Sequence, residues 1–237
     1  MEIVKSGSIY DNGIAQSPGF ACNETANLFL GDTVSGKELQ WVKLKNGLLV
    51  ADRCVCTEIS WEQLHNAGFV FGTPVTMDGE TYLCRCLKVG VQDHEPNEWD
   101  VALDETGEDN DLWHWDEALF WGQETFEYSS SFRTVRGWAY ARLWDIDDVA
   151  NRSPYTGFRP ALEYLGSKSC PPDTLLGKEV KIYGSDSITA EGRLVDFSDY
   201  DIVLSAGFVV PPDCSWVSVY KNNIIISRNK VVWLKEV

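Results

Sequence analysis

The sequence predicts an α+β fold in two parts, a mixed domain over residues 1–168 and a small all-β domain over residues 175–237. Three observations support this prediction. Glycine-bounded apolar runs fill the first 90 residues, an acidic tract rich in tryptophan follows, and the C-terminal part consists of short strand-like runs separated by turn residues. The 237 residues are enough for one large domain and a small one.

Composition and charge limit the classes of function. The formal net charge is −16 at pH 7, so the surface repels nucleic acid and anionic membranes and attracts basic proteins, including those that bind nucleic acid. The same charge also serves solubility alone. No apolar run is long enough to span a membrane, and the N-terminus lacks the features of a signal peptide. We therefore expect a cytoplasmic protein whose seven cysteines are reduced.

Local signals in the first 90 residues predict a helix and a hairpin. Ser60 is a suitable N-cap, Gln63 follows at the position that completes a capping box, and Gly68 is a suitable stop. The Asp78-Gly79 pair between two apolar runs predicts a tight hairpin turn. Short strands are expected at residues 70–72 and 73–75.

Charge is divided unevenly along residues 91–167. The first part, residues 91–124, holds twelve Asp and Glu and neither Lys nor Arg, whereas five arginines follow in the second part. We therefore expect the two parts to pair through guanidinium–carboxylate hydrogen bonds. A short helix is expected where Leu112, Trp115 and Leu119 share one face. The five arginines are Arg133, Arg136, Arg142, Arg152 and Arg159.

The C-terminal zone begins after a linker at residues 169–174, which contains two prolines and no periodic pattern. The runs GKEVKIYG, EGRLVDFSDYDIVLSAG, CSWVSVYKNN and NIIISRNKVVWLKEV then read as closely spaced strands with turn residues between them. Short strands at this spacing are typical of a small barrel or sandwich.

A set of Arg, Gly and aromatic residues lies between residues 132 and 163. It resembles the C-terminal core of the C-type-lectin-like fold, in the branch that includes formylglycine-generating enzymes, bacterial sulfatase-modifying proteins and phage proteins diversified by reverse transcriptase. The second Gly and the Ser of the usual pattern are missing. The resemblance implies a lectin-like domain over residues 40–165 and an origin in a phage or mobile element. It implies structural roles for Arg136, Gly137, Trp138, Arg142, Gly157, Phe158 and Arg159, beside the matching Arg133.

The C-terminal strands are similar to an Sm-like barrel, and a generic SH3-like barrel has almost the same pattern. The matching positions are Gly192, Leu194, Phe197, 202–204, Ile226 and Arg228. Ser198, Asp201 and Asn229 depart from the family pattern, and an acidic residue at position 201 disfavours contacts with phosphates and bases. We therefore expect the small barrel without a role in RNA binding.

The stretch HEPNEWD, residues 94–100, contains the Glu-Pro-Asn tripeptide with which C-type lectins present oxygen ligands to calcium. Calcium takes about six to eight oxygen ligands, several of them carboxylates. The resemblance implies a calcium site formed by Glu95, Asn97, Glu98 and Asp116. The alternative is a structural role, in which Trp99 is buried and Glu98 or Asp100 binds an arginine of the second part.

Two Cys-x-Cys pairs suggest a possible zinc site. Side chains at i and i+2 of a strand share one face, so two paired strands would bring four thiolates together at a tetrahedral site. The alternative is that these cysteines are small buried hydrophobic side chains, because zinc sites usually space their cysteines by two residues. The four candidates are Cys54, Cys56, Cys84 and Cys86.

Motifs of catalysis are missing from the sequence. His65, His94 and His114 do not fall in a metal-binding pattern, and no nucleophile elbow, P-loop or zinc-protease motif occurs. We therefore expect a non-enzymatic protein without a resident cofactor, and a formylglycine-generating-like oxidase is a third hypothesis that depends on the fold alone.

Acidic and aromatic residues of the second zone are candidates for a partner surface, with a plain surface loop as the alternative. The leading hypothesis is a non-catalytic binding protein that recognises another macromolecule through lectin-like loops, centred on residues 144–157. The second is an inhibitor of a host defence nuclease, of the anti-CRISPR type, whose acidic surface occupies a nucleic-acid channel. The candidate partner-binding residues are Glu105, Glu108, Asp109, Asp111, Trp144, Asp145, Asp147, Asp148 and Tyr155.

Overall fold

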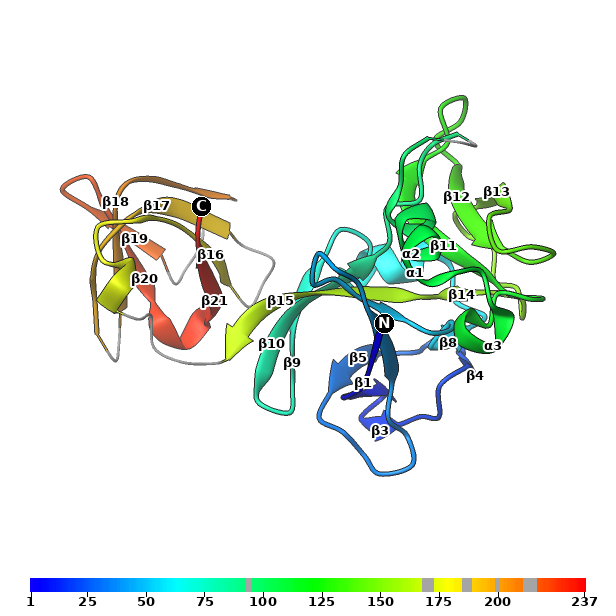
Figure 1. Ribbon diagram of the computed structural model, residues 1–237. Helices are drawn as coiled ribbons and strands as arrows, with labels where there is room; N and C mark the ends of the chain where they lie inside the picture. The colour runs from blue at the N-terminus through cyan, green and yellow to red at the C-terminus, as the bar shows by residue number, and fades with distance from the viewer. Residues whose placement is uncertain (93–94, 168–172, 185–188, 199–200, 211–216) are drawn as a thin grey trace. The chain divides into compact units, whose positions relative to one another are not determined.

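The computed structural model divides into two compact units, which are described separately (Figure 1). Unit 1 comprises residues 1–78 and 82–164, and unit 2 comprises residues 79–81 and 165–237. The structure describes residues 1–92, 95–167, 173–184, 189–198, 201–210 and 217–237. The expected linker at 169–174 therefore lies mostly outside the described residues. Strands predominate over helices in both units, so the chain is a β-rich α+β protein.

One six-stranded sheet, most of it in unit 1, pairs the N-terminal strands with the strand that begins at residue 160. The order is β1-β6-β7-β15-β10-β9, and β6 pairs antiparallel with both β1 and β7. The strands are β1 (Glu2–Lys5), β6 (Gln40–Lys43), β7 (Leu49–Ala51), β15 (Pro160–Ser167), β10 (Glu80–Cys86) and β9 (Thr73–Met77).

A second six-stranded sheet of unit 1 carries the segment with the lectin-like pattern. Its order is β13-β12-β11-β14-β8-β4, with parallel pairing of β11 to β14 and of β4 to β8. The strands are β13 (Trp144–Asp148), β12 (Phe132–Gly137), β11 (Leu119–Thr125), β14 (Thr156–Phe158), β8 (Cys56–Thr57) and β4 (Phe20–Ala21). A third, small sheet consists of β3 (Ile14–Ala15), β2 (Ser8–Asp11) and β5 (Leu28–Gly31) in this order.

Central strands of unit 1 are buried on both faces. In β6, Trp41 belongs to one apolar core and Val42 to the other, and in β11 Phe120 and Trp121 are divided in the same way. All four side chains are fully buried. Because successive side chains of a strand point to opposite faces, such strands read as continuous apolar runs. No helix among the described residues is long and apolar enough to cross a membrane.

Two local predictions in unit 1 are confirmed. Helix α1 (Trp61–Asn66) begins after Ser60, which forms the expected reciprocal capping box with Gln63. Strands β9 and β10 flank the Asp78-Gly79 turn, and both turn residues have positive φ, +54° and +84°, as a tight hairpin turn requires.

Two other local predictions are wrong. Residues 70–72 form a turn rather than a strand, since Gly72 at φ +120° leaves the extended conformation and contacts Leu83. The expected helix through Leu112, Trp115 and Leu119 stops early. Helix α3 (Asn110–Trp113) ends at His114, and Leu119 begins β11, where pairing with β12 and β14 overrides the apolar spacing.

Unit 2 has one six-stranded sheet, and each of its strands coincides with a run that the sequence predicts as a strand. The order is β19-β20-β18-β17-β16-β21. Gly192 and Gly207 allow β17 and β18 to approach closely, because a Cβ at Gly207 would lie 2.1 Å from the carbonyl oxygen of Glu191. The strands are β16 (Glu179–Gly184), β17 (Thr189–Phe197), β18 (Asp201–Val210), β19 (Val217–Tyr220), β20 (Asn223–Ser227) and β21 (Val231–Glu236), with short 3₁₀ turns at Asp173–Leu175 and Arg228–Lys230.

The carboxylate of Asp78 ties the β9–β10 turn to two other segments of unit 1. It accepts hydrogen bonds from the Ser6 hydroxyl at 2.8 Å and from the Gly7 N–H at 3.2 Å. It also accepts them from the N–H and the hydroxyl of Thr33, at 2.8 and 2.6 Å. Burial raises the pKa of Asp78, but these hydrogen bonds outweigh it and lower the pKa from 3.8 to about 2.

Replacing Asp78 with asparagine is expected to lower the free energy of unfolding by about 1 kcal/mol, a value reduced for the exposure of this side chain. Because the pKa is lower in the folded state, the contribution of Asp78 is fully present above about pH 4 and is lost as pH falls toward about 2. Denaturant unfolding of both proteins at about pH 6 and about pH 2 measures this difference. If the two proteins differed in unfolding free energy by the same amount at both pH values, the ionised carboxylate of Asp78 would not be the stabilising group.

Candidate functional site

Helix α2 (Glu98–Thr106) follows the Glu-Pro-Asn tripeptide and forms the base of the candidate site. Asn97 is its N-cap, since the side-chain oxygen accepts the N–H of Asp100 at 2.9 Å. The helix buries Trp99 completely, and the Trp99 Nε1 donates to the carbonyl oxygen of Ala141 at 2.7 Å. The tripeptide therefore starts a helix that holds the 138–143 loop through Trp99.

The buried side chain of Arg136 links α2 to the 138–143 loop. Its side chain is 1% exposed, and its Nη2 lies 3.0 Å from a carboxylate oxygen of Asp100. Its Nε donates to the Val89 carbonyl at 3.2 Å, and its Nη1 donates to the Arg142 carbonyl at 2.8 Å. The sequence predicts this arrangement, with Trp99 buried and Asp100 bound by an arginine of the second part, and the structure confirms it.

Arg142 is the second arginine that pairs with the acidic part, whereas Arg152 lies 3.6 Å from Glu24, and Arg133 and Arg159 donate to backbone carbonyls. Its guanidinium donates to Glu108 at 2.5 Å and to Asp104 at 2.6 Å, and it lies 3.4 Å from Asp100. The hydrogen bond that Arg142 donates to Glu108 raises the pKa of Arg142, although partial burial lowers it, so the cation stays charged. Part of the acidic tract is thus neutralised within the protein.

Three residues with positive φ meet where α3, β11 and β12 come together. They are His114 at φ 44°, Glu117 at φ 55° and Trp138 at φ 91°. The Trp138 N–H donates to the Trp115 carbonyl at 2.9 Å, and the Glu117 N–H donates to the Trp138 carbonyl at 3.1 Å. A bulky residue such as tryptophan seldom adopts this φ, and backbone strain of this kind is concentrated at functional sites.

Acidic and aromatic side chains surround the strained junction, and we name this set of residues the acidic–aromatic face. The Trp138 ring packs edge-on against Tyr155 at 5.0 Å between ring centres. Tyr140 and Tyr155 are 57% and 51% exposed. The face consists of Asp104, Glu108, Asp109, Asp111, Asp116, Glu117, Trp138, Tyr140 and Tyr155.

The structure places the predicted partner-binding residues at three sites. Four of them, Glu108, Asp109, Asp111 and Tyr155, lie in the acidic–aromatic face. Glu105 instead accepts the backbone N–H of Lys45 at 2.9 Å. The other four, Trp144, Asp145, Asp147 and Asp148, belong to strand β13.

Residues 144–148 form an edge strand, whereas the sequence predicts a loop there. Trp144 is half-buried and donates to the Gly90 carbonyl at 3.3 Å, so its ring is not a free contact surface. Asp147 accepts hydrogen bonds from Asn151 at 2.9 and 2.8 Å. Asp145 and Asp148 remain exposed, and carboxylates on an edge strand discourage pairing with another sheet.

The calcium ligands implied by the lectin resemblance do not converge. Asn97 caps α2, and Glu95 accepts the Val91 N–H at 2.7 Å. Glu98 binds the buried Arg85 at 2.6 Å, and Asp116 lies beside Trp138 at the other end of the tract. Among the described residues no group of three or more His, Cys, Asp or Glu is arranged to hold a metal ion.

The four cysteines of the predicted zinc site are likewise separated. Cys54 packs in one core of unit 1, and Cys56, Cys84 and Cys86 pack in the other. Burial raises the pKa of Cys54, Cys84 and Cys86, and a hydrogen bond with Cys22 together with burial raises that of Cys56. Zinc binds thiolates, so these environments favour the alternative reading of buried apolar side chains.

The residues that the lectin resemblance marks as structural are mostly buried. Arg159 is fully buried between Trp99 and Phe120, with its guanidinium carbon 4.9 Å from each ring centre. It donates to the carbonyl oxygens of Ala51, Asp52 and His114 at 3.3, 3.0 and 3.3 Å. Gly137 (φ +105°) and Gly157 lie against backbone atoms, Phe158 is fully buried, and Trp138 alone is a part of the face.

Asp104, Glu117 and Tyr140 are not among the candidate residues predicted from the sequence, which assigns Asp116 to calcium and gives Trp138 a structural role. A usable signal is the Trp138-Ala139-Tyr140 run between Arg136 and Arg142, because both arginines bind α2 and leave the run between them at the surface. The positive φ of Trp138 has no counterpart in the sequence.

The structure and sequence of this chain were compared with protein-family models, curated proteins and solved structures, and no match was found in any of the three.

Proposed function

We propose that this chain is a non-catalytic binding protein that recognises a basic segment of a protein partner through the acidic–aromatic face. The observation that supports this proposal is that exposed carboxylates and the exposed rings of Tyr140 and Tyr155 surround the strained junction at Trp138. Tyrosine and tryptophan supply much of the binding energy at protein interfaces, and carboxylates select basic partners.

Contacts within unit 1 anchor both segments that carry the exposed tyrosines of the face. Arg136 and Trp99 fasten the 138–143 loop to α2, and the Leu119 N–H donates to the Tyr155 carbonyl at 2.7 Å. A surface that is ordered in advance loses less conformational entropy on binding, which supports a recognition role. Arg142 neutralises only the Asp104 and Glu108 end, so the charge that remains is concentrated at Asp109, Asp111, Asp116 and Glu117.

We propose that unit 1 has a C-type-lectin-like fold, that unit 2 is a small barrel, and that the protein acts in the cytoplasm of a host cell as a phage or mobile-element product. The buried Arg159 and Gly157 of the lectin-like pattern and the close β17–β18 approach at Gly207 support the two fold assignments.

The second candidate function is inhibition of a host defence nuclease, in which the face occupies a basic nucleic-acid channel. Four exposed carboxylates on one surface favour it. Internal pairing of Glu98, Asp100, Asp104 and Glu108 with arginines reduces the charge available to such a decoy. A competition experiment separates the two candidates: the captured partner is loaded with nucleic acid and this chain is added. An inhibitor that occupies the nucleic-acid channel displaces the nucleic acid, whereas a protein that binds elsewhere on the partner does not.

The proposal is tested by capture from a bacterial lysate with matched charge variants and quantitative mass spectrometry. The face variant carries Asp111→Asn, Asp116→Asn and Glu117→Gln. The control carries Glu24→Gln, Glu62→Gln and Glu127→Gln outside the face and has the same net charge. We expect a basic partner to be retained by the original chain and the control and depleted about tenfold or more with the face variant.

A second variant removes the aromatic contribution without changing charge. The double variant Tyr140→Ala, Tyr155→Ala is expected to bind the purified partner about tenfold or more weakly in a direct titration. The double variant Asp145→Asn, Asp148→Asn on β13 is expected to have little effect on binding. Retention of the same proteins by the face variant and the control would overturn the proposal. Rising salt should weaken a complex that depends on the carboxylates.

A further inference from the structure

A row of polar side chains in unit 1 spans strands β1 and β6 and the residue that follows β7. Lys5 of β1 is the cross-strand partner of Gln40 in β6. The Trp41–Ala51 register places Asp52 next to Gln40, and the Asp52 N–H donates to the Gln40 carbonyl at 3.0 Å. Trp41, on the opposite face of β6, is fully buried. Lys5, Gln40 and Asp52 therefore share the face of the sheet that lies opposite the core of Trp41.

Asp52 is an unusual member of this row because it is a carboxylate only 2% exposed. Arg53 neutralises it through the Nε at 3.0 Å and the Nη2 at 2.7 Å. The same Nη2 lies 3.0 Å from the Nε2 of His114, and the carbonyl of Asp52 accepts a hydrogen bond from Arg159. The position of the Arg53 guanidinium is thus fixed from two sides.

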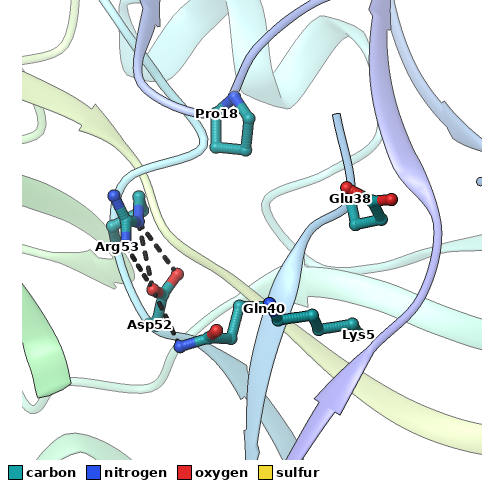
Figure 2. A pocket seen from close by; sticks show the side chains of 6 residues that line it. All are labelled: Lys5, Pro18, Glu38, Gln40, Asp52 and Arg53. Carbon is teal, nitrogen blue, oxygen red and sulfur yellow. Dashed lines mark hydrogen bonds and ion pairs between the residues drawn. The ribbon is translucent and has the colours of Figure 1, made fainter. Parts of the chain in front are cut away.

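These side chains line a pocket of about 230 Å³, shown in Figure 2. Arg53 and Asp52 form one side of it, Lys5 and Glu38 lie on the other, and Pro18 stands opposite Gln40. Backbone hydrogen bonds, one of them from the Gly36 N–H at 3.1 Å, lower the pKa of Glu38, as does Lys5, so its carboxylate is ionised at neutral pH. Among the described residues Lys5 makes no ion pair within 4 Å.

We propose that this pocket binds a small zwitterion, a molecule that carries one carboxylate and one ammonium group, as an amino acid does. Lys5 and Arg53 would receive the carboxylate, and Glu38 would receive the ammonium group. Gln40 and Pro18 complete the wall with an amide and an apolar surface.

Charge and size favour a zwitterion over an ion of one sign. Arg53 already neutralises Asp52, so Lys5 and Glu38 are the two opposite charges left for a ligand, and a ligand with one charged group would pair with only one of them. The volume lies below the range of about 300–1,000 Å³ that is typical of pockets for drug-sized ligands, which indicates a smaller molecule. The proposal does not depend on the acidic–aromatic face.

The first experiment is a titration of the full chain with the standard L-amino acids at up to millimolar concentration, followed by calorimetry. The analogues propionate and ethylamine each keep one charged group of alanine and serve as single-charge probes. We expect at least one amino acid to bind, and each single-charge probe to bind about tenfold or more weakly than a zwitterion.

Two pocket variants locate the site. Lys5→Met and Glu38→Gln are each expected to weaken binding of the amino acid by about tenfold or more. The surface control Lys45→Met is expected to leave the affinity unchanged. Lys5 and Glu38 lie at the rim, and neither side chain ties distant segments together, so circular dichroism should show that both variants fold. If one variant failed to fold, the other would still decide the outcome.

Three results would overturn the proposal. The first is that no amino acid binds at millimolar concentration. The second is that propionate binds as tightly as the amino acids, which would show a plain anion site. The third is that binding survives both Lys5→Met and Glu38→Gln, which would place the ligand elsewhere on the chain.

Discussion

Replacing Arg136 with alanine is expected to lower the free energy of unfolding of unit 1 by about 3–5 kcal/mol. The substitution leaves Asp100 without its buried cation and removes the donors to the carbonyls of Val89 and Arg142. A buried pair that loses one partner costs more than the pair itself contributes, because the remaining charge stays desolvated. Guanidinium unfolding followed by tryptophan fluorescence measures the change.

Arg142→Ala is the matched control for this substitution. Its side chain also binds Asp100, but it is 35% exposed and its other partners, Asp104 and Glu108, face solvent. We expect a loss of about 1 kcal/mol, in the range of surface ion pairs. Equal losses for the two variants would show that burial of Arg136 has no energetic role, and the account of the 138–143 loop would then be wrong.

Gly157→Ala is expected to destabilise unit 1 by about 3 kcal/mol through steric overlap alone. Gly157 lies in β14 between β11 and β8, and an added Cβ would stand 2.2 Å from the carbonyl oxygen of Cys56. The φ of Gly157 is not in the left-handed region, so the cost comes from the neighbouring strand, which must move away.

Gly19→Ala provides the opposite case. Gly19 has φ +86° and nothing within 4 Å of an added Cβ, so only backbone strain of about 1 kcal/mol is expected. The denaturant midpoints of the two variants measure, within the same unit, the cost of steric overlap at Gly157 and the cost of backbone strain at Gly19. A smaller loss for Gly157→Ala than for Gly19→Ala would contradict the close approach of β14 and β8.

Features that depend on neighbouring residues in the chain could be predicted from the sequence. Ser60 and Gln63 satisfy each other's backbone groups within one helical turn, and Asp78-Gly79 needs only two residues to reverse the chain. In unit 2, strands that follow one another in the chain pair as antiparallel hairpins, and apolar and polar residues alternate along them. Their positions therefore also follow from the local sequence pattern.

Features that depend on distant residues could not be predicted in this way. Leu112, Trp115 and Leu119 have helical spacing, yet Leu119 forms a strand because Gly137 of β12 and Thr156 of β14 pair with it. Asn97 has the chemistry of both a calcium ligand and a helix cap, and only the course of the chain after Glu98 decides between them. The apolar period of Trp99, Ala102 and Leu103 was a usable signal for that helix.

The same limit applies to the candidate site. Arg136 and Arg142 could be expected to bind the acidic tract, since the charges of the two parts are complementary. Their effect on the chain between them, which turns Trp138 to φ 91° and exposes Tyr140, depends on the close approach of Gly137 to the Ala118 carbonyl. No local pattern encodes such a contact across the sheet.

The burial of the thiols makes alkylation a reporter of local opening in each core of unit 1. Only thiolates react readily, so Cys54, Cys84 and Cys86 become reactive when the surrounding core opens to water. Cys54 belongs to the core beneath α2, which supports the acidic–aromatic face, and Cys84 and Cys86 belong to the other core. Peptide-resolved labelling rates therefore report separately how often each of the two cores opens while the chain as a whole stays folded.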